Sequence, residues 1–222
     1  MGGIVTDLIL INGSPKTKGS ASGVILQGLK QALPREISVR ECAIRTAPLT
    51  EEAVQAAVCS DVLVFAFPLY VDGLPSHMID ALLKLECSLK SAPPKERFVY
   101  AIANCGFYEG HQCAPALQMM ENWSARSNLS WGQGLGVGAG GMLSGLESVP
   151  MGAGLKKNLG KALRAMAGRI LSCEQAETSY ITANFPRYLY KAAAEIGWRK
   201  GAKANGLRTK DLFAQPGKED TV

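Results

Sequence analysis

The stretch Leu8 to Ser22, LILINGSPKTKGSAS, combines an apolar run, a hydroxyl-rich loop and the start of an amphipathic helix. Its first four residues are all β-favouring side chains, which is typical of a strand covered on both faces within a parallel sheet. Asn12 and Gly13 end this run, and apolar positions with helical spacing begin at Val24. The stretch therefore predicts a buried strand, a tight loop and a helix in direct succession.

The loop between this strand and this helix predicts a phosphate site. It carries four hydroxyl side chains and two lysines, Lys16 and Lys18. It leads into a helix N-terminus, where free backbone N–H groups and the positive end of the helix dipole favour an anion. The alternative is an ordinary turn whose hydroxyl groups only cap the helix.

The glycine spacing of the loop restricts the kind of phosphate that it can hold. It is not a Walker A loop, because Gly13 and Gly19 are separated by five residues and a serine follows the second glycine. It also lacks the GxGxxG pattern of dinucleotide sites. A terminal monophosphate fits this loop better than ATP or a dinucleotide pyrophosphate.

The composition is that of one well-buried domain with an extension. The chain has 222 residues, of which 47% are hydrophobic, and its mean hydropathy is +0.05. None of its six cysteines forms a CxxC pair, so a compact zinc or iron–sulfur site is not expected, and we expect reduced thiols in the cytoplasm.

Membrane association is not expected either. No apolar run reaches the roughly 18 residues that a membrane span requires. The segment Met1–Thr6, MGGIVT, formally matches the N-myristoylation pattern. We interpret this match as chance, because no second membrane signal accompanies it.

Strand and helix patterns alternate along the rest of the chain. Further strand patterns lie at 37–43, 61–67, 98–103 and within 131–143, and helix patterns follow from residues 50, 75, 114 and 154. Five strands alternating with helices predict an α/β fold: an open parallel sheet with helices on both faces. We expect the strand order 2-1-3-4-5, with the half-polar strand 37–43 at an edge.

This strand order brings three turns together at the carboxyl ends of strands 1, 3 and 4. The turns are Gly13 to Ser22, Pro68 to Gly73 and Asn104 to His111. Ligands of such sheets bind at this switch point. A phosphate loop at one end of a crevice and aromatic side chains at the other suit a ligand with a phosphate and a flat ring, and FMN has this shape.

Three motifs carry a resemblance to a known family. They are INGSPKTKGSAS from Ile11, FPLYVDGLPSHMIDALLK from Phe67 and ANCGFYEGHQ from Ala103. Up to about residue 175, the chain resembles the flavodoxin-like NAD(P)H-dependent FMN oxidoreductases, a family that includes flavin and quinone reductases. The resemblance implies a flavodoxin-like fold and FMN as cofactor. It further implies a homodimer, with NAD(P)H and a small acceptor, such as a quinone, nitro compound or flavin, as substrates.

The resemblance also assigns the cofactor-binding residues. The FMN phosphate would be held by the loop residues Ser14, Lys16, Ser20, Ala21 and Ser22. The ribityl chain and ring would lie beside Pro68, Leu69, Tyr70 and Val71. The pyrimidine edge would face Asn104, Cys105, Gly106 and Phe107, with Tyr108 as a second candidate, beside Tyr70, for stacking or positioning.

The resemblance requires no catalytic side chain and no metal, because NAD(P)H gives its hydride to flavin N5. Cys105 is either a flavin contact or a small buried residue. His111 is a candidate substrate contact, whereas His77 is expected to be structural. The chain departs from the family's iron–sulfur members, since it has no tight cysteine cluster, and from the acidic carrier flavodoxins, since its net charge is +5.

The C-terminal segment 181–222 carries most of this positive charge. Its eight Lys/Arg and four Asp/Glu give +4 of the net +5. We expect residues 1–180 to form the FMN-binding domain and 181–222 a basic helical extension, whose helix has its cap and first turn at Asn184 to Pro186 and stops at Asn205-Gly206. Its basic side is interpreted as solvated surface on a docked helix. The alternatives are attraction of NADPH phosphates, anionic membrane or nucleic acid, although no nucleic-acid motif is present.

Two rival functions remain open at this point. One is a flavodoxin-like electron carrier without NAD(P)H activity, and the other is a flavodoxin-like binding module without redox function. The first would bind flavin that nicotinamide does not reduce, whereas the second would not bind FMN.

Overall fold

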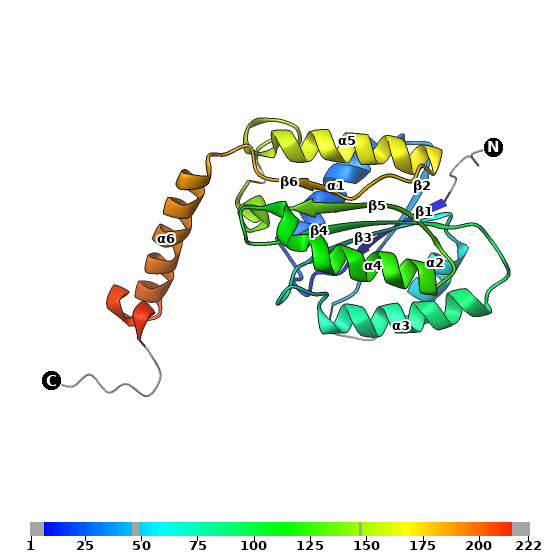
Figure 1. Cartoon of the computed structure of the whole chain (residues 1–222), viewed down its shortest axis with the longest axis horizontal. Helices are drawn as coiled ribbons and strands as arrows, with labels where there is room; N and C mark the ends of the chain where they lie inside the picture. The colour runs from blue at the N-terminus through cyan, green and yellow to red at the C-terminus, as the bar shows by residue number, and fades with distance from the viewer. Residues whose placement is uncertain (1–6, 46–48, 147, 215–222) are drawn as a thin grey trace. The chain divides into compact units, whose positions relative to one another are not determined.

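The computed structural model describes residues 7–45, 49–146 and 148–214, and the chain divides into two compact units, Met1–Asn184 and Phe185–Val222. The Met1–Thr6 motif lies outside the described residues. Figure 1 shows the first unit as a sheet between two layers of helices. The first unit therefore has the expected α/β architecture.

The sheet is fully parallel and has the strand order β2-β1-β3-β4-β5-β6. Its strands are β1 (Asp7–Asn12), β2 (Ser38–Ala43), β3 (Val62–Pro68), β4 (Phe98–Asn104), β5 (Ser130–Val137) and β6 (Ser179–Ile181). The first five adopt the expected order 2-1-3-4-5, with β2 at an edge. β6 is an addition to the five expected strands, because its three residues are too few for a periodic pattern.

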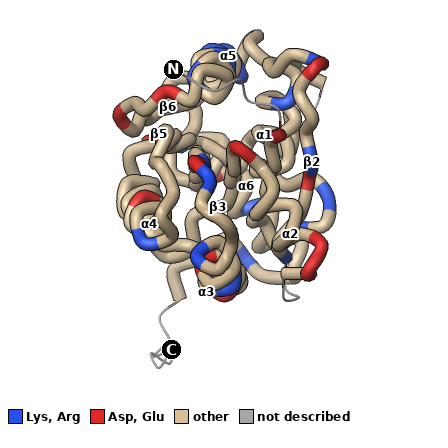
Figure 2. Tube along the Cα trace, turned by 90° about the vertical axis from the view of Figure 1, so that its right-hand side faces the viewer, with Lys and Arg blue, Asp and Glu red and all other residues tan. Residues whose placement is uncertain are grey.

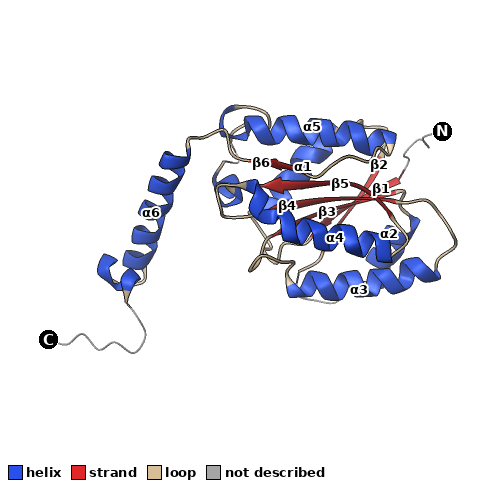
Figure 3. Ribbon diagram, in the orientation of Figure 1, coloured by secondary structure: helices blue, strands red, loops and turns tan. Residues whose placement is uncertain are grey.

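Helices cover both faces of the sheet, as Figure 3 shows. One face carries α1 (Ala21–Ala32) and α5 (Lys157–Ser172), and the other carries α2 (Glu51–Cys59), α3 (Ser76–Ser91) and α4 (Ala114–Arg126). Short 3-10 helices are η1 (Gly110–Cys113), η2 (Gly140–Gly145) and η3 (Gly154–Lys156). The serine and threonine side chains expected near the helix starts cap α1 and α2: Ser20 Oγ accepts from Gly23 N, and Thr50 Oγ1 accepts from Ala53 N.

The hydrophobic core has two halves, one on each face of the sheet. Alternate residues of β1 enter different halves, because successive side chains of a strand point to opposite faces. Leu8 and Leu10 pack with α1 and α5, whereas Ile9 and Ile11 pack with the helices of the opposite face. Each such side chain is at most 1% exposed and contributes about 1.5–3 kcal/mol to stability by burial. The apolar run of β1 is thus explained by burial on both faces.

The second unit contains α6 (Arg187–Ala204) and η4 (Thr209–Phe213). The N-cap of α6 is Pro186 rather than the expected Asn184, so the helix begins two residues later than predicted, and Asn205 is its C-cap. Gly206 follows with a φ of 75°, a conformation that favours glycine, and this explains the stop. Within the described residues, no helix is both long and apolar enough to span a membrane.

Candidate functional site

The three turns predicted to form one crevice are hydrogen-bonded to one another through Asn104. The side-chain Nδ2 of Asn104 donates to Ser22 Oγ at 2.9 Å and to the Phe67 carbonyl at 2.8 Å. The Asn104 carbonyl accepts from Leu69 N at 2.8 Å. Asn104 is only 5% exposed, so these bonds lie away from water and hold the start of α1 against the carboxyl ends of β3 and β4.

The first turn is shaped by its own polar groups. Asn12 Oδ1 accepts from Ser14 N at 3.0 Å, and Ser14 Oγ accepts from Lys16 N at 3.3 Å. The capping role considered for the hydroxyl groups applies to Ser20, which caps α1. Because Ser20 satisfies Gly23 N, the first two N–H groups of the helix, those of Ala21 and Ser22, lack an acceptor within it. These N–H groups are suited to an anion.

The serines and lysines of this turn differ in their burial. Ser14, Ser20 and Ser22 are buried, whereas Lys16 through Gly19 are exposed. A serine hydroxyl that accepts a hydrogen bond keeps its own proton for donation. The loop therefore has buried hydroxyl donors at its base and the exposed side chains of Lys16 and Lys18 at its rim.

The second turn reverses the chain within two residues. Tyr70 N donates to the Gly73 carbonyl at 3.1 Å, and Gly73 N donates to the Tyr70 carbonyl at 3.0 Å. The residues between them, Val71 and Asp72, have φ values of 45° and 61°. This conformation is unusual for a β-branched residue, and backbone strain of this kind concentrates at functional sites. The sequence predicted a turn at Pro68 to Gly73 but did not reveal the positive φ values within it.

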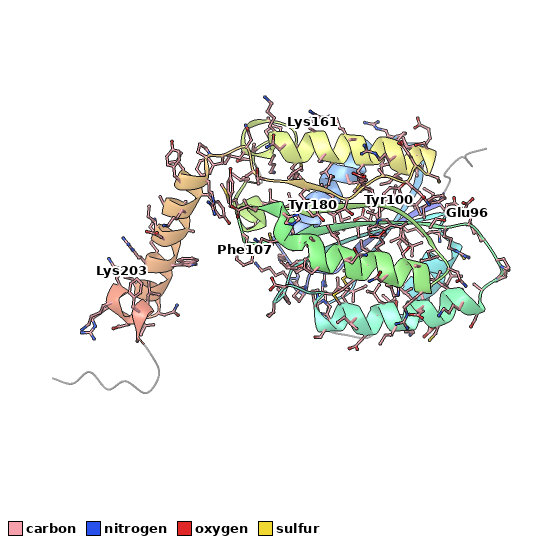
Figure 4. The ribbon with its side chains drawn as sticks, in the orientation of Figure 1. Glu96, Tyr100, Phe107, Lys161, Tyr180 and Lys203 are labelled. Carbon is pink, nitrogen blue, oxygen red and sulfur yellow. The ribbon has the colours of Figure 1, made fainter. Side chains whose placement is uncertain are left out.

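Two aromatic side chains stand exposed on these turns. Tyr70 on the second turn is 47% exposed, and Phe107 on the third is 55% exposed. Figure 4 shows Phe107 at one end of the sheet and Glu96 at the opposite end. Pro68, Leu69 and Tyr108 are partly buried, while Val71 and Gly106 are exposed.

A glycine-rich segment after β5 wraps the third turn, and the sequence analysis did not include it in the site. Gly140 N donates to the Cys105 carbonyl at 2.7 Å, and Ala139 N donates to the Phe107 carbonyl at 2.5 Å. A Cβ on Gly138 would lie 2.0 Å from the Tyr108 carbonyl oxygen, so only glycine fits. The cluster of glycines from Gly132 to Gly141 was the available signal, but it did not indicate which turn the segment would contact.

Cys105 and Cys113 form a buried pair beneath the third turn. A hydrogen bond from the Cys113 thiol lowers the pKa of Cys105, and the same bond raises the pKa of Cys113. Cys105 Sγ also lies 3.7 Å from the Phe107 carbonyl and 3.6 Å from the Glu109 carbonyl. Cys105 is therefore the more acidic thiol of the pair, and it is placed next to the predicted pyrimidine edge.

The two histidines have different surroundings. His77 Nε2 lies 3.1 Å from the Gly13 carbonyl, which can only accept, so this nitrogen carries the proton. His77 thereby holds the first turn against the start of α3. The ring of His111 packs edge-on against Tyr180 of β6, with centroids 4.8 Å apart.

Comparison with known proteins supports the fold. No protein-family model matches the sequence, and no curated protein is significantly similar to it. Solved structures do match. An oxidoreductase from Corynebacterium diphtheriae superposes with a TM-score of 0.53 at 14% identity, over 77% of this chain and 99% of that one. An NADPH-quinone reductase from P. pentosaceus superposes with a TM-score of 0.52 at 10% identity, over 73% of this chain and 98% of that one.

A third structure, described as a flavone reductase, gives a TM-score of 0.54 at 11% identity over 78% of this chain and 66% of that one. At identities this low, the likeness establishes the fold. The flavodoxin-like fold predicted from the sequence is thus confirmed.

Proposed function

We propose that this protein is an FMN-dependent NAD(P)H oxidoreductase that reduces a small acceptor such as a quinone, nitro compound or flavin. The observation that carries the proposal is the Asn104 network, which joins a helix start suited to an anion to two turns with exposed aromatic side chains. Fold neighbours described as an NADPH-quinone reductase and a flavone reductase support the same class.

The residues present fit the phosphate end of FMN. The backbone N–H groups of Ala21 and Ser22 stand at the free start of α1, and the buried Ser14 hydroxyl and the exposed Lys16 belong to the loop that leads into it. Charge-assisted hydrogen bonds from such donors bind a phosphate dianion. We propose that Ser20 contributes indirectly, by capping α1 and leaving its first N–H groups for the ligand.

The other two turns fit the flat ring. Leu69, Tyr70 and Val71 would flank the ring and ribityl chain, and the backbone of Asn104 to Phe107 would face its polar edge, with Tyr108 nearby. FMN held there would supply the hydride chemistry that connects NAD(P)H to the acceptor. The chain orients both substrates against the ring, with backbone donors positioned for the charge that develops there.

The extension from residue 181 completes the proposal. We propose that it docks its helix against the FMN-binding domain or a second subunit, and that the protein is a homodimer. Analytical ultracentrifugation of the full chain and of a chain ending at residue 184 tests this, and a monomer in both cases would contradict it.

The primary test is an anaerobic absorbance spectrum of the purified protein, reconstituted with FMN and then mixed with NADPH or NADH. Bleaching of the bound-flavin band near ~450 nm is expected with at least one donor. A bound flavin that neither donor reduces would identify an electron carrier instead. Failure to bind FMN would contradict the phosphate-site assignment and favour a non-redox binding module.

A further inference from the structure

A cavity of about 490 Å³ lies beside the phosphate loop. Its walls are the loop 16–20, the first turns of α1, the end of β2 and the segment from Val149 to Lys156. The volume falls in the range of roughly 300–1,000 Å³ that is usual for small-molecule sites. Among the described residues, its lining includes none from the second or third turn, so the cavity is separate from the crevice proposed for the flavin ring.

Lys156 is the feature that singles out this cavity. It lines the cavity, it is only 4% exposed, and it stands at the N-cap position of α5. Across the part of the chain that the structure describes, its side chain makes no hydrogen bond or ion pair. The Nζ atom of Lys156 keeps contact with solvent in the cavity, while the rest of its side chain is covered by protein. An ammonium group in such a recess, with no carboxylate beside it, attracts an anion. The position of Lys156 therefore points to an anionic ligand.

The other charges around the cavity have the same sign. Lys16 and Lys18 lie on the loop wall, and Arg45 follows β2. The one described carboxylate in the lining, Glu41, is already engaged by Lys30 and by Gln27. Figure 2 shows Lys and Arg positions along the α1 and β2 side of the sheet. The cavity thus has cationic groups on three walls and a single, already engaged carboxylate, which favours a ligand with more negative charge than one phosphate group carries.

The remaining lining suits an organic body attached to the charged group. Val24, Val149 and Met151 form an apolar wall, and the amides of Gln27 and Gln31 add hydrogen-bonding groups. Small-molecule sites commonly combine an apolar lining with a few polar groups that set orientation.

We propose that this cavity binds a ligand that carries a diphosphate group, of the nucleoside diphosphate class, with Lys156 as its buried phosphate contact. The inference goes beyond the oxidoreductase activity, because Lys18, Arg45 and Lys156 have no assigned role in the flavin site. The diphosphate lies between these three residues, while the nucleoside packs on the apolar wall.

Calorimetric titration of the full-length protein with ADP and with inorganic pyrophosphate tests the proposal. Both should bind, more weakly at high salt, because the site is cationic. Lys156→Met should weaken both by about tenfold or more, as expected for loss of a charge-assisted contact. Lys161→Met is the matched control, since Lys161 is exposed on the same helix, as Figure 4 shows, and this variant should bind like the wild type.

The outcomes separate the possible sources of the diphosphate. Tighter binding of ADP than of pyrophosphate identifies a nucleotide site, and equal affinities identify a site for the diphosphate alone. No binding by the wild type, or equal affinities of the wild type and Lys156→Met, would overturn the proposal. If Lys156→Met does not fold, Arg45→Gln provides a second variant, because Arg45 is exposed. It should also bind ADP and pyrophosphate more weakly than the wild type. Because the titration contains no FMN, a failure of the oxidoreductase proposal would leave its result unaffected.

Discussion

The side-chain amide of Asn104 donates a 2.9 Å hydrogen bond to Ser22 Oγ across 82 positions of sequence. This bond joins the end of β4 to the first turn of α1, and the same amide holds the Phe67 carbonyl of β3. One buried side chain thus connects the phosphate end of the proposed flavin site to its ring end. Removal of the Asn104 side chain should therefore lower both the free energy of unfolding and the affinity for the cofactor.

Asn104→Ala should lower the free energy of unfolding by about 2–3 kcal/mol, because two buried hydrogen bonds are lost and the Phe67 carbonyl is left without its donor. Urea denaturation measures this change, and an FMN titration should show weaker binding. Asn122→Ala, at an exposed position of α4, is the control. A stability loss no larger than that of the control would mean that the network is not what holds the turns together.

Gly138→Ala should be destabilising by about 1–3 kcal/mol or more, because its Cβ would lie 2.0 Å from the Tyr108 carbonyl oxygen and the third turn must move. Gly141→Ala is the matched control, since a Cβ there meets nothing within 4 Å. Thermal and urea unfolding compare the two variants. Equal stabilities would show that the segment after β5 does not pack against the third turn.

Phe107→Ala should weaken FMN binding by about three- to tenfold, which corresponds to the loss of one aromatic contact with the ring. The free energy of unfolding should change little, because Phe107 is 55% exposed. Fluorescence titration of the apoprotein with FMN measures the affinity, with Phe213→Ala in the second unit as control. An unchanged affinity would place the flavin ring away from the third turn.

Alkaline pH should destabilise the fold through Cys42. Burial raises the pKa of its thiol from 9.0 to about 11. Between about pH 9 and pH 11, the unfolded state releases this proton while the folded state keeps it. The contribution of Cys42 to the free energy of unfolding is therefore complete below about pH 9 and is lost as the pH rises to about 11. The free energy of unfolding falls by about 3 kcal/mol over this range, since each pKa unit corresponds to about 1.4 kcal/mol. Urea unfolding at several pH values should show a flatter dependence for Cys42→Ala than for the wild type.

The control for that comparison is Cys59→Ala, which removes an exposed thiol. If Cys42→Ala retains the full dependence of the wild type, another group accounts for the alkaline loss. Tyr100 is the first to examine, because burial also raises its pKa.

Local patterns were sufficient for most of the elements. Helix α4 begins at Ala114, as predicted, because the apolar spacing that indicates a helix is a property of one continuous segment. Thr50 was predicted as the start of α2 and is its N-cap. The three-residue strand β6 escaped prediction, since its pairing with β5 rather than its own pattern defines it.

The sequence by itself determined the alternation of buried strands and amphipathic helices, and with it the meeting of three turns at one edge of a parallel sheet. Burial periodicity and capping are local properties, and parallel strands necessarily bring their carboxyl ends together. Only the tertiary structure decided that Asn104 bonds Ser22, that Gly138 lies against Tyr108 and that Lys156 is buried in a cavity. Each of these depends on atoms from segments far apart in the chain, whose packing no local pattern specifies.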